Sequence, residues 1–239
     1  MTATILLTRP RAASERMRKD LQARNLHLSV SPLIEPEFVA QPPDLRGIKG
    51  VVFTARTAVE AFAALCPAAR LPAYAVGDAT ADAARQAGLC VVSAGGDADA
   101  LVRRILADGV RGPLLHLRGE HARGAVAQRL SRAGCPTREA VLYHQKAQPF
   151  TPEARALLDG HEPVLVPLFS PRTATIFSRQ HRGQAPLFIA AMSPQVAEAV
   201  MVPRRRLVVA EHPSMTAMVS ALDELLDAAR DLEDRRSAQ

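Results

Sequence analysis

Two segments of the chain repeat one pattern, F-[TS]-x-R-T-A, at positions 53–58 and 169–174. Each segment follows an apolar run and precedes a stretch that we expect to be helical. The same offset of 116 residues aligns Gly77 with Ser193 and Asp82 with Glu198. A strand that ends in a hydroxyl residue and opens a helix leaves backbone N–H groups at the helix start, where anions bind. The repeat therefore predicts two similar halves that share an anion-binding site.

A second repeat, at an offset of 109 residues, aligns Arg9 with Arg118 and Met17 with Val126. The two kinds of repeated unit alternate along the chain, and strands that alternate with helices predict an α/β fold with parallel sheets. Each pair of units could form a contiguous domain. Alternatively, the middle pair could be inserted into a domain built from both chain ends. Extended, proline-marked segments near 30–40 and 140–150 slightly favour the insertion, because they could pair as a two-stranded bridge.

Polar residues gather where the expected strands end, and parallel α/β folds bind ligands outside the carboxyl ends of their strands. After the first strand, for example, a helix is expected over about 15–24, with Ser14 as its N-cap. The residues expected to bind a ligand are Arg9, Thr54, Ala55, Arg56, Thr57, Gly77, Asp78, Thr80, Arg118, Gly119, Ser170, Pro171, Arg172, Thr173, Ser193 and Ser214.

The chain is long enough, at 239 residues, for one large or two ordinary domains, and 48% of its residues are hydrophobic. It has no run of the roughly 18 apolar residues that a membrane span needs, and its first residues lack the pattern of a signal peptide. Cys66, Cys90 and Cys135 form no CxxC pair, which argues against a disulfide framework or a zinc site. We expect a cytoplasmic protein with no membrane association and no bound metal.

The net charge of +6 comes mostly from arginine, whose planar guanidinium suits carboxylates and phosphates. A basic excess also fits nucleic acid, but we find no helix-turn-helix, zinc or RNP signature, and aromatic residues make up only 4%. An acidic small molecule fits at least as well. The histidines form no HxxxH or HxH pair, so we expect them to be structural or surface residues. Gly95 and Gly96 lack a GxGxxG context, which excludes dinucleotide binding.

Taken together, these residues resemble the uroporphyrinogen-III synthase family over nearly the whole chain. The motifs that carry the resemblance are Leu7-Thr8-Arg9-Pro10, Val52-Phe53-Thr54-Ala55, Ala75-Val76-Gly77-Asp78-Ala79-Thr80-Ala81, Leu117-Arg118-Gly119-Glu120, Val141-Leu142-Tyr143, Phe169-Ser170-Pro171 and His212-Pro213-Ser214. Each motif is short, and their joint order and spacing make the resemblance specific.

The resemblance implies two similar α/β domains joined by a two-stranded linker. Domain 1 would hold residues 1–35 and 148–239, domain 2 residues 36–147, and the linker strands would lie near 30–40 and 140–148. The implied reaction cyclises linear hydroxymethylbilane to uroporphyrinogen III, with inversion of the last pyrrole ring and loss of water, and needs no metal or organic cofactor. The substrate carries eight carboxylates, which arginines and helix N-termini at a cleft between the domains would suit. We expect a monomer with transient contact to the preceding enzyme of the pathway.

Loss of the substrate hydroxyl needs a proton donor, and Tyr143 matches the family's tyrosine in the linker region. Its reference pKa of about 10 makes tyrosine a weak acid unless the site helps, so a packing or substrate-contact role is the alternative. The chain departs from the family at Ala55, where serine is usual, and near Ser193, where glycine is more common. We therefore expect backbone N–H groups to hold the substrate, and plain helix capping is the alternative role of the hydroxyl residues.

Two other functions stay open. One is a cleft protein that binds a tetrapyrrole or another polyanion without chemistry, which the departures at Ala55 and Ser193 keep in view. The other, resting on charge alone, is binding of nucleic acid. The isomer of uroporphyrinogen formed from hydroxymethylbilane would distinguish the enzyme from these two alternatives.

Overall fold

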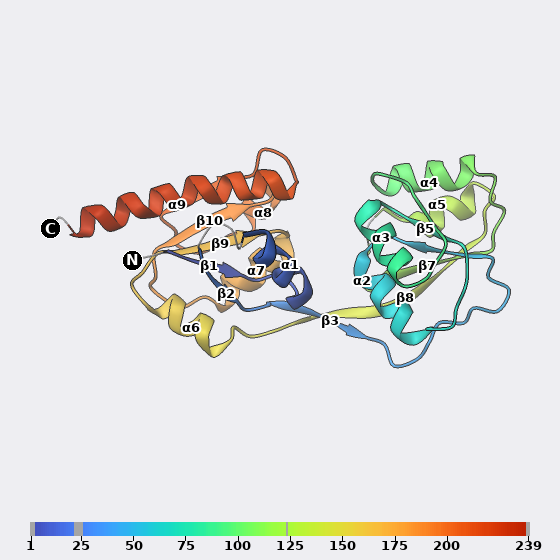
Figure 1. The fold of residues 1–239 in the computed structure, drawn as a ribbon, viewed down its shortest axis with the longest axis horizontal. Coiled ribbons are helices and arrows are strands. Elements are labelled where there is room, and N and C mark those ends of the chain that lie inside the picture. Colours follow the sequence, from blue (N-terminus) through green and yellow to red (C-terminus); the bar gives the residue numbers. More distant parts are fainter. Residues whose placement is uncertain (1–2, 22–25, 123, 238–239) are drawn as a thin grey trace. The chain divides into compact units, whose positions relative to one another are not determined.

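A computed structural model describes residues 3–21, 26–122 and 124–237 of the chain. Contacts between residues divide it into two compact units (Figure 1). Unit 1 combines both ends of the chain, Met1–Glu35 and Ala147–Gln239, and unit 2 is the continuous middle, Pro36–Lys146.

Unit 1 is built on a five-stranded sheet in the order β11-β10-β9-β1-β2, and all of its strand pairs are parallel. The strands are β1 (Thr4–Leu7), β2 (His27–Val30), β9 (Val164–Leu168), β10 (Leu187–Ala191) and β11 (Arg206–Val209). The helices are α1 (Arg11–Leu21), α6 (Pro152–Asp159), α7 (Pro171–Gln180), α8 (Pro194–Glu198) and α9 (Met215–Ser237).

Both faces of this sheet are buried, which is the rule for parallel sheets. Successive strand residues point to opposite faces, so Leu6 packs in the cluster under α6 and α7, whereas Ile5 and Leu7 pack in the cluster under α1 and α9. The apolar runs of β1, β9 and β10 follow from this two-sided burial.

Unit 2 is built on a six-stranded sheet in the order β3-β8-β7-β4-β5-β6. Its strands are β3 (Ile34–Phe38), β4 (Gly50–Phe53), β5 (Ala73–Ala75), β6 (Val91–Ser93), β7 (Leu114–Gly119) and β8 (Thr137–Ala147). Its helices are α2 (Arg56–Leu65), α3 (Asp78–Gln86), α4 (Ala98–Ala107) and α5 (Val126–Arg132). The clusters on the two faces hold residues of α2 and α3 on one side and of α4 and α5 on the other.

Each of the five strands of unit 1 has a counterpart in unit 2, where β3 is an additional edge strand. Each sheet has one place where the chain reverses the direction in which successive strands are added. In unit 1 this place lies between β1 and β9, and in unit 2 between β4 and β7. At such a switch point the loops leave the sheet in opposite directions, and open α/β sheets bind ligands there. The fold thus makes the carboxyl ends of β1, β9, β4 and β7 the candidate ligand-binding edges.

The predicted α/β class with parallel sheets is confirmed. The predicted helix over 15–24 is wrong at its start, because α1 begins at Arg11 and Ser14 lies inside it. The carbonyl of Pro10 accepts hydrogen bonds from the N–H groups of Ala13 and Ser14, so the helix begins directly after the turn. Ser14 does not cap the helix; its hydroxyl donates to the carbonyl of Arg9 over 2.9 Å. The predicted end of this helix, at residues 22–24, lies outside the described residues. Within the described ranges, no helix is long and apolar enough to cross a membrane.

Candidate functional site

At the switch point of unit 1, Arg9 follows β1 and lies beside the residue that follows β9. Its guanidinium stacks over the ring of Phe169, with the Cζ atom 4.1 Å from the ring centroid. Burial, and secondarily the charge of Arg16, lower the pKa of Arg9 from its usual value, although a guanidinium stays protonated at any physiological pH. The site therefore holds a cation that has lost part of its hydration, which favours an anionic partner.

The first turn of α7 is closed by its own side chains. The hydroxyl of Ser170 accepts a hydrogen bond from the N–H of Thr173 over 3.1 Å, and the two hydroxyl oxygens are 2.9 Å apart. Pro171 occupies the first helical position, where a missing N–H costs nothing. The hydroxyl of Ser170 thus acts as a helix cap, a role worth about 1 kcal/mol.

The other two predicted serines of unit 1 also stand before helices. Ser193 is the N-cap residue of α8 and makes no side-chain capping bond, but α8 has only five residues. Ser214 is exposed and its hydroxyl accepts a hydrogen bond from the N–H of Ala217 over 3.2 Å. Ser214 therefore serves as the cap of α9.

At the switch point of unit 2, Thr54 follows β4 and meets a histidine of the neighbouring strand β7. The Thr54 Oγ1 atom lies 3.1 Å from Nε2 of His116, whose side chain is only 1% exposed. Burial lowers the pKa of His116 from its usual value, against a smaller opposing effect of Glu139. Sequence reasoning overlooked this histidine. The signal was a titratable residue at a buried strand position, in Leu114-Leu115-His116-Leu117.

The start of α2, next along the chain, lacks a side-chain cap. Ala55 is the N-cap residue and cannot supply a capping hydroxyl, so no capping side chain bonds the first N–H groups of the helix. Arg56 forms an ion pair with Glu60 one turn later, at 3.1 Å, and Thr57 is half-buried. The helix also has no acidic residue in its first turn, so its positive end is not neutralised from within.

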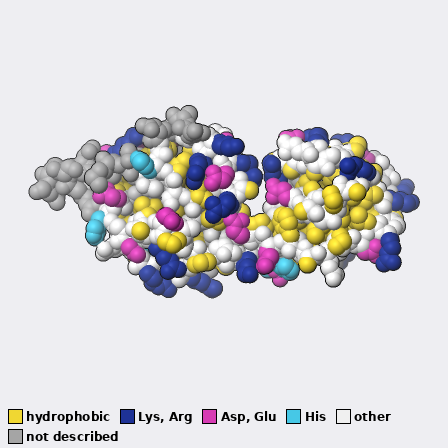
Figure 2. All heavy atoms as spheres, turned by 60° about the horizontal axis from the view of Figure 1, so that its bottom comes forward, with side chains coloured by type: hydrophobic (Ala, Val, Ile, Leu, Met, Phe, Trp, Pro, Cys, Tyr) yellow, Lys and Arg dark blue, Asp and Glu magenta, His cyan; other side chains and the backbone are white. Residues whose placement is uncertain are grey.

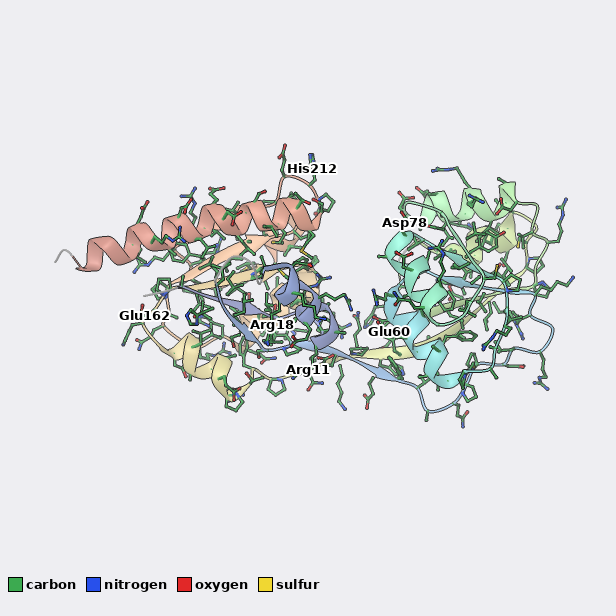
Figure 3. All side chains as sticks on the ribbon, viewed as in Figure 1. Arg11, Arg18, Glu60, Asp78, Glu162 and His212 are labelled. Carbon is green, nitrogen blue, oxygen red and sulfur yellow. The ribbon has the colours of Figure 1, made fainter. Side chains whose placement is uncertain are left out.

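The start of α3 is different, because it already carries an acid. Gly77 is the N-cap residue in an extended conformation, and Asp78 follows it with its carboxylate accepting a hydrogen bond from the Ser93 hydroxyl over 2.7 Å. Figure 3 labels Asp78 at this helix start and Glu60 on α2. Thr80 is buried and its N–H donates to the Gly77 carbonyl. A bound carboxylate would meet the charge of Asp78 here, which makes α2 the better anion site of the two.

Arg118 and Gly119 end β7, where Tyr143 of β8 lies against them. The Arg118 guanidinium donates to the carbonyls of Gly119 and Glu120 and pairs with Glu139 at 2.9 Å, so it stiffens the strand end. A Cβ atom added to Gly119 would lie 2.5 Å from the Tyr143 ring, which shows how closely the ring covers the glycine. Tyr143 is 7% exposed, and burial together with the charge of Glu60 raises the pKa of its phenol. The phenol therefore keeps its proton at neutral pH.

The predicted residues thus separate into groups within each unit. Arg9 lies with the start of α7 in unit 1, and Thr54 lies with the end of β7 in unit 2. Arg172 lies at the start of α7, half-buried. In the described part of the chain, no group of three or more His, Cys, Asp or Glu side chains could hold a metal ion.

Two units, each built on a mainly parallel sheet with helices on both faces, define a protein of the α/β class. A profile of the family described as uroporphyrinogen-III synthase HemD matches residues 15–220, most of the chain. The chain belongs to this family, whose members are cyclising lyases of tetrapyrrole biosynthesis. They convert hydroxymethylbilane to uroporphyrinogen III.

The fold is similar to that of solved structures. The uroporphyrinogen-III synthetase of Helicobacter pylori 26695 superimposes with a TM-score of 0.68 at 17% identity, covering 94% of this chain and 100% of that one, and it supports the fold. A mutant uroporphyrinogen III synthase of Thermus thermophilus covers 95% of this chain and 100% of its own, with a TM-score of 0.49 at 11% identity. No curated protein matches the sequence significantly.

Proposed function

We propose that this chain carries out its family's reaction by binding substrate carboxylates at the carboxyl edges of its sheets, through Arg9 and the first N–H groups of α2. The observation that carries the proposal is the start of α2. It follows β4 at a switch point, has no side-chain cap, and has no acid in its first turn. The partial positive charge of such a helix end attracts carboxylates, of which the substrate has eight.

Arg9 supplies the second contact. Its stacking on Phe169 fixes the guanidinium, so less side-chain entropy is lost when a carboxylate binds. We expect Arg9→Ala to raise KM about tenfold with a small effect on kcat. Arg18→Ala is the matched control, since Arg18 lies exposed on α1 and pairs with Glu15 at 3.5 Å (Figure 3). An unchanged KM for Arg9→Ala would remove Arg9 from the binding site.

Arg118 has a second possible role. Its guanidinium is engaged by Glu139 and by two carbonyls, so Arg118→Ala should lower stability as well as substrate affinity. A KM that stays at the wild-type value while stability falls would assign Arg118 to the scaffold alone.

Tyr143 is the proposed donor to the hydroxyl that leaves as water. Because the pKa of its phenol is raised, we expect it to donate a hydrogen bond to the leaving oxygen and to release its proton only as that oxygen departs. Tyr143→Phe keeps the ring and removes the hydroxyl, and kcat should fall about 10²-fold. Full turnover in this variant would exclude the role.

One assay tests the reaction itself. The protein is given freshly made hydroxymethylbilane, the products are oxidised, and the type I and type III isomers are separated. We expect type III product in proportion to the amount of protein. Type I product alone, at the uncatalysed rate, would refute the function.

We further propose that the units are two domains, 1–35 with 148–239 and 36–147, joined by linker strands near 30–40 and 140–148. The division of internal contacts near residues 35 and 147 supports this proposal. A fragment that spans residues 36–147 should then unfold cooperatively by itself, and a fragment without a folded core would contradict the division.

We also propose a cytoplasmic monomer that meets the preceding pathway enzyme only transiently and does not bind nucleic acid. Free thiols at Cys66, Cys90 and Cys135 suit a reducing compartment. On the face seen in Figure 2, basic side chains are interspersed with acidic ones and do not form one stripe. Light scattering in the presence and absence of duplex DNA measures the oligomeric state and the binding of nucleic acid. The mass of a dimer would contradict the monomer, and a complex with DNA would contradict the absence of nucleic-acid binding.

A further inference from the structure

His116 occupies a position in β7 where the strand pattern calls for an apolar residue. Its neighbours Leu115 and Leu117 pack in the cluster under α2 and α3. By the alternation of a strand, His116 and Arg118 point to the opposite face, on the side of α4 and α5. A nearly fully buried imidazole is unfavourable unless its nitrogens are used, so its partners need an explanation.

Three polar side chains, those of Arg118, Glu139 and Thr54, form a chain of contacts with this imidazole. The Nη2 atom of Arg118 lies 2.9 Å from Oε2 of Glu139, and Oε1 of the same carboxylate lies 3.4 Å from Nδ1 of His116. On the other side of the ring, Nε2 of His116 lies 3.1 Å from Oγ1 of Thr54. Glu139 is the strand partner of His116 in the pairing of β7 with β8, so the backbone sets this arrangement.

His116, Arg118 and Glu139 also line a pocket of about 570 Å³ between the end of β7 and α5, whereas Thr54, which is half-buried, lies outside its lining. The charged groups that face the imidazole are Glu139 and Arg118. Burial keeps the ring neutral at physiological pH, because its pKa is lowered. A neutral imidazole carries a hydrogen on only one of its two ring nitrogens. Which nitrogen carries it decides whether the Thr54 hydroxyl donates a hydrogen bond to Nε2 or accepts one from it.

The carboxylate of Glu139 favours the tautomer of His116 in which Nδ1 carries the hydrogen. At 3.4 Å the geometry leaves Nδ1 without a formal hydrogen bond, yet the negative charge beside it still favours a hydrogen there over a lone pair. The Nε2 atom then carries the lone pair and accepts the hydrogen of the Thr54 hydroxyl. With its hydrogen committed, the oxygen of Thr54 presents only lone pairs to a ligand.

We propose that His116 is a positioning residue that holds the Thr54 hydroxyl oxygen as a hydrogen-bond acceptor for a pyrrole N–H of the substrate. This assignment rests on the proposed function and refines it, because it separates two kinds of contact at one switch point. The uncapped N–H groups of α2 bind carboxylates, whereas the Thr54 oxygen repels carboxylates and selects the N–H donors that only the pyrrole rings carry.

The contact has a consequence for the rate. When the C–O bond of the hydroxymethyl group breaks, its electron pair leaves with the oxygen, which takes up a proton and departs as water. The carbon that remains is cationic, and the pyrrole nitrogen shares its lone pair with it, so the N–H becomes a stronger donor. A fixed acceptor therefore binds the transition state more tightly than the ground state, which raises kcat.

The position of the hydrogen is measured first, in the free protein, by ¹⁵N NMR of labelled histidine. We expect His116 to have a protonated Nδ1 and an unprotonated, hydrogen-bonded Nε2. In Thr54→Val, the Nε2 signal should move toward that of a free unprotonated nitrogen. A hydrogen on Nε2 of the wild-type protein would overturn the proposal whether or not the protein is active.

Kinetics then test the role in turnover. Thr54→Val is nearly isosteric and should lower kcat about tenfold or more, with KM within about twofold, while Thr54→Ser should restore most of kcat. His116→Phe should resemble Thr54→Val, and the double variant should lose no more than either alone. His181→Asn is the matched control, since His181 is also buried but stacks on Phe177 in unit 1.

The outcomes are distinct. Full kcat in Thr54→Val, or an effect on KM alone, would overturn the proposal, as would equal losses in Thr54→Val and Thr54→Ser. If His116→Phe does not fold, the NMR result and the two Thr54 variants still decide. A wild-type protein without type III product would refute the proposed function, and the NMR result would stand separately.

Discussion

Replacing Gly119 with alanine is expected to displace the Tyr143 ring and to reduce turnover. The new Cβ atom would lie 2.5 Å from Cζ, 2.7 Å from Cε2 and 2.8 Å from the hydroxyl oxygen of Tyr143. Ordinary contacts of a Cβ atom begin at 3.4 Å, so the ring has to withdraw by about 0.9 Å. The ring is packed in the cluster under α2 and α3, so it can withdraw only by displacing its neighbours.

The magnitude follows from this overlap. Overpacking of a well-packed core costs about 1–3 kcal/mol in the free energy of unfolding. A phenol that is moved by about 1 Å from its contact with the substrate should lose about 10²-fold in kcat. Gly119→Ala should therefore approach the turnover of Tyr143→Phe, although the phenol hydroxyl is still present.

Chemical denaturation of a double-mutant cycle isolates the cause. In the Tyr143→Leu background the shorter side chain no longer meets the new methyl group, so Gly119→Ala should cost less than about 0.5 kcal/mol. The same penalty in both backgrounds would show that the strain lies elsewhere and would refute the reasoning. Lost stability with full turnover would keep the packing argument and would remove Tyr143 from the reaction.

Three further substitutions test other parts of the structure. His116→Gln should reduce the pH dependence of stability. Because the pKa of His116 is lowered in the folded protein, the imidazole binds a proton more readily in the unfolded chain. The wild-type protein should therefore lose stability as pH falls below about 6.5, by at most about 1.4 kcal/mol per pH unit. Unfolding free energies at pH 7.5 and 5.5 measure the change, and an unaltered difference would contradict it. Phe177→Ala should cost about 3–5 kcal/mol, since this fully buried ring packs edge-on against Phe150, and denaturation that shows under 1 kcal/mol would be inconsistent with that core. Asp97→Ala should lower the free energy of unfolding by about 1 kcal/mol, because the Asp97 carboxylate caps the first turn of α4. Amide hydrogen exchange should show reduced protection in α4 alone, and unchanged protection there would exclude the capping role.

Much of the local structure could be read from short stretches of sequence. Asp97 caps α4 and Pro194 occupies the first turn of α8, and both residue types are favoured at these positions of a helix. These features depend on side chains within three or four positions of one another, so the local sequence contains all the partners. The predicted cap at Ser14 was wrong for a related reason, because the turn at Pro10 starts the helix at Arg11, before the expected cap.

The candidate site was only partly accessible from the sequence. The uncapped start of α2 could be anticipated from Ala55, since alanine has no hydroxyl to offer. The contact between Thr54 and His116 could not, because 62 positions separate the two residues. Isolated histidines usually lie on the surface, and only the pairing of β4 with β7 places this one beside the end of β4. The close fit of Gly119 and Tyr143 has the same origin in the pairing of β7 with β8.

The amino-acid sequence alone was sufficient for the α/β class, the repeat of its elements and the polar character of the strand ends, because periodicity and helix-start chemistry are local properties. The tertiary structure alone established which strands are neighbours. β1 lies beside β9, more than half the chain away, and β4 lies beside β7. Parallel strands pair through long-range backbone hydrogen bonds that leave no local pattern. The switch points, and the contacts that His116 and Tyr143 make there, exist only once those pairs have formed.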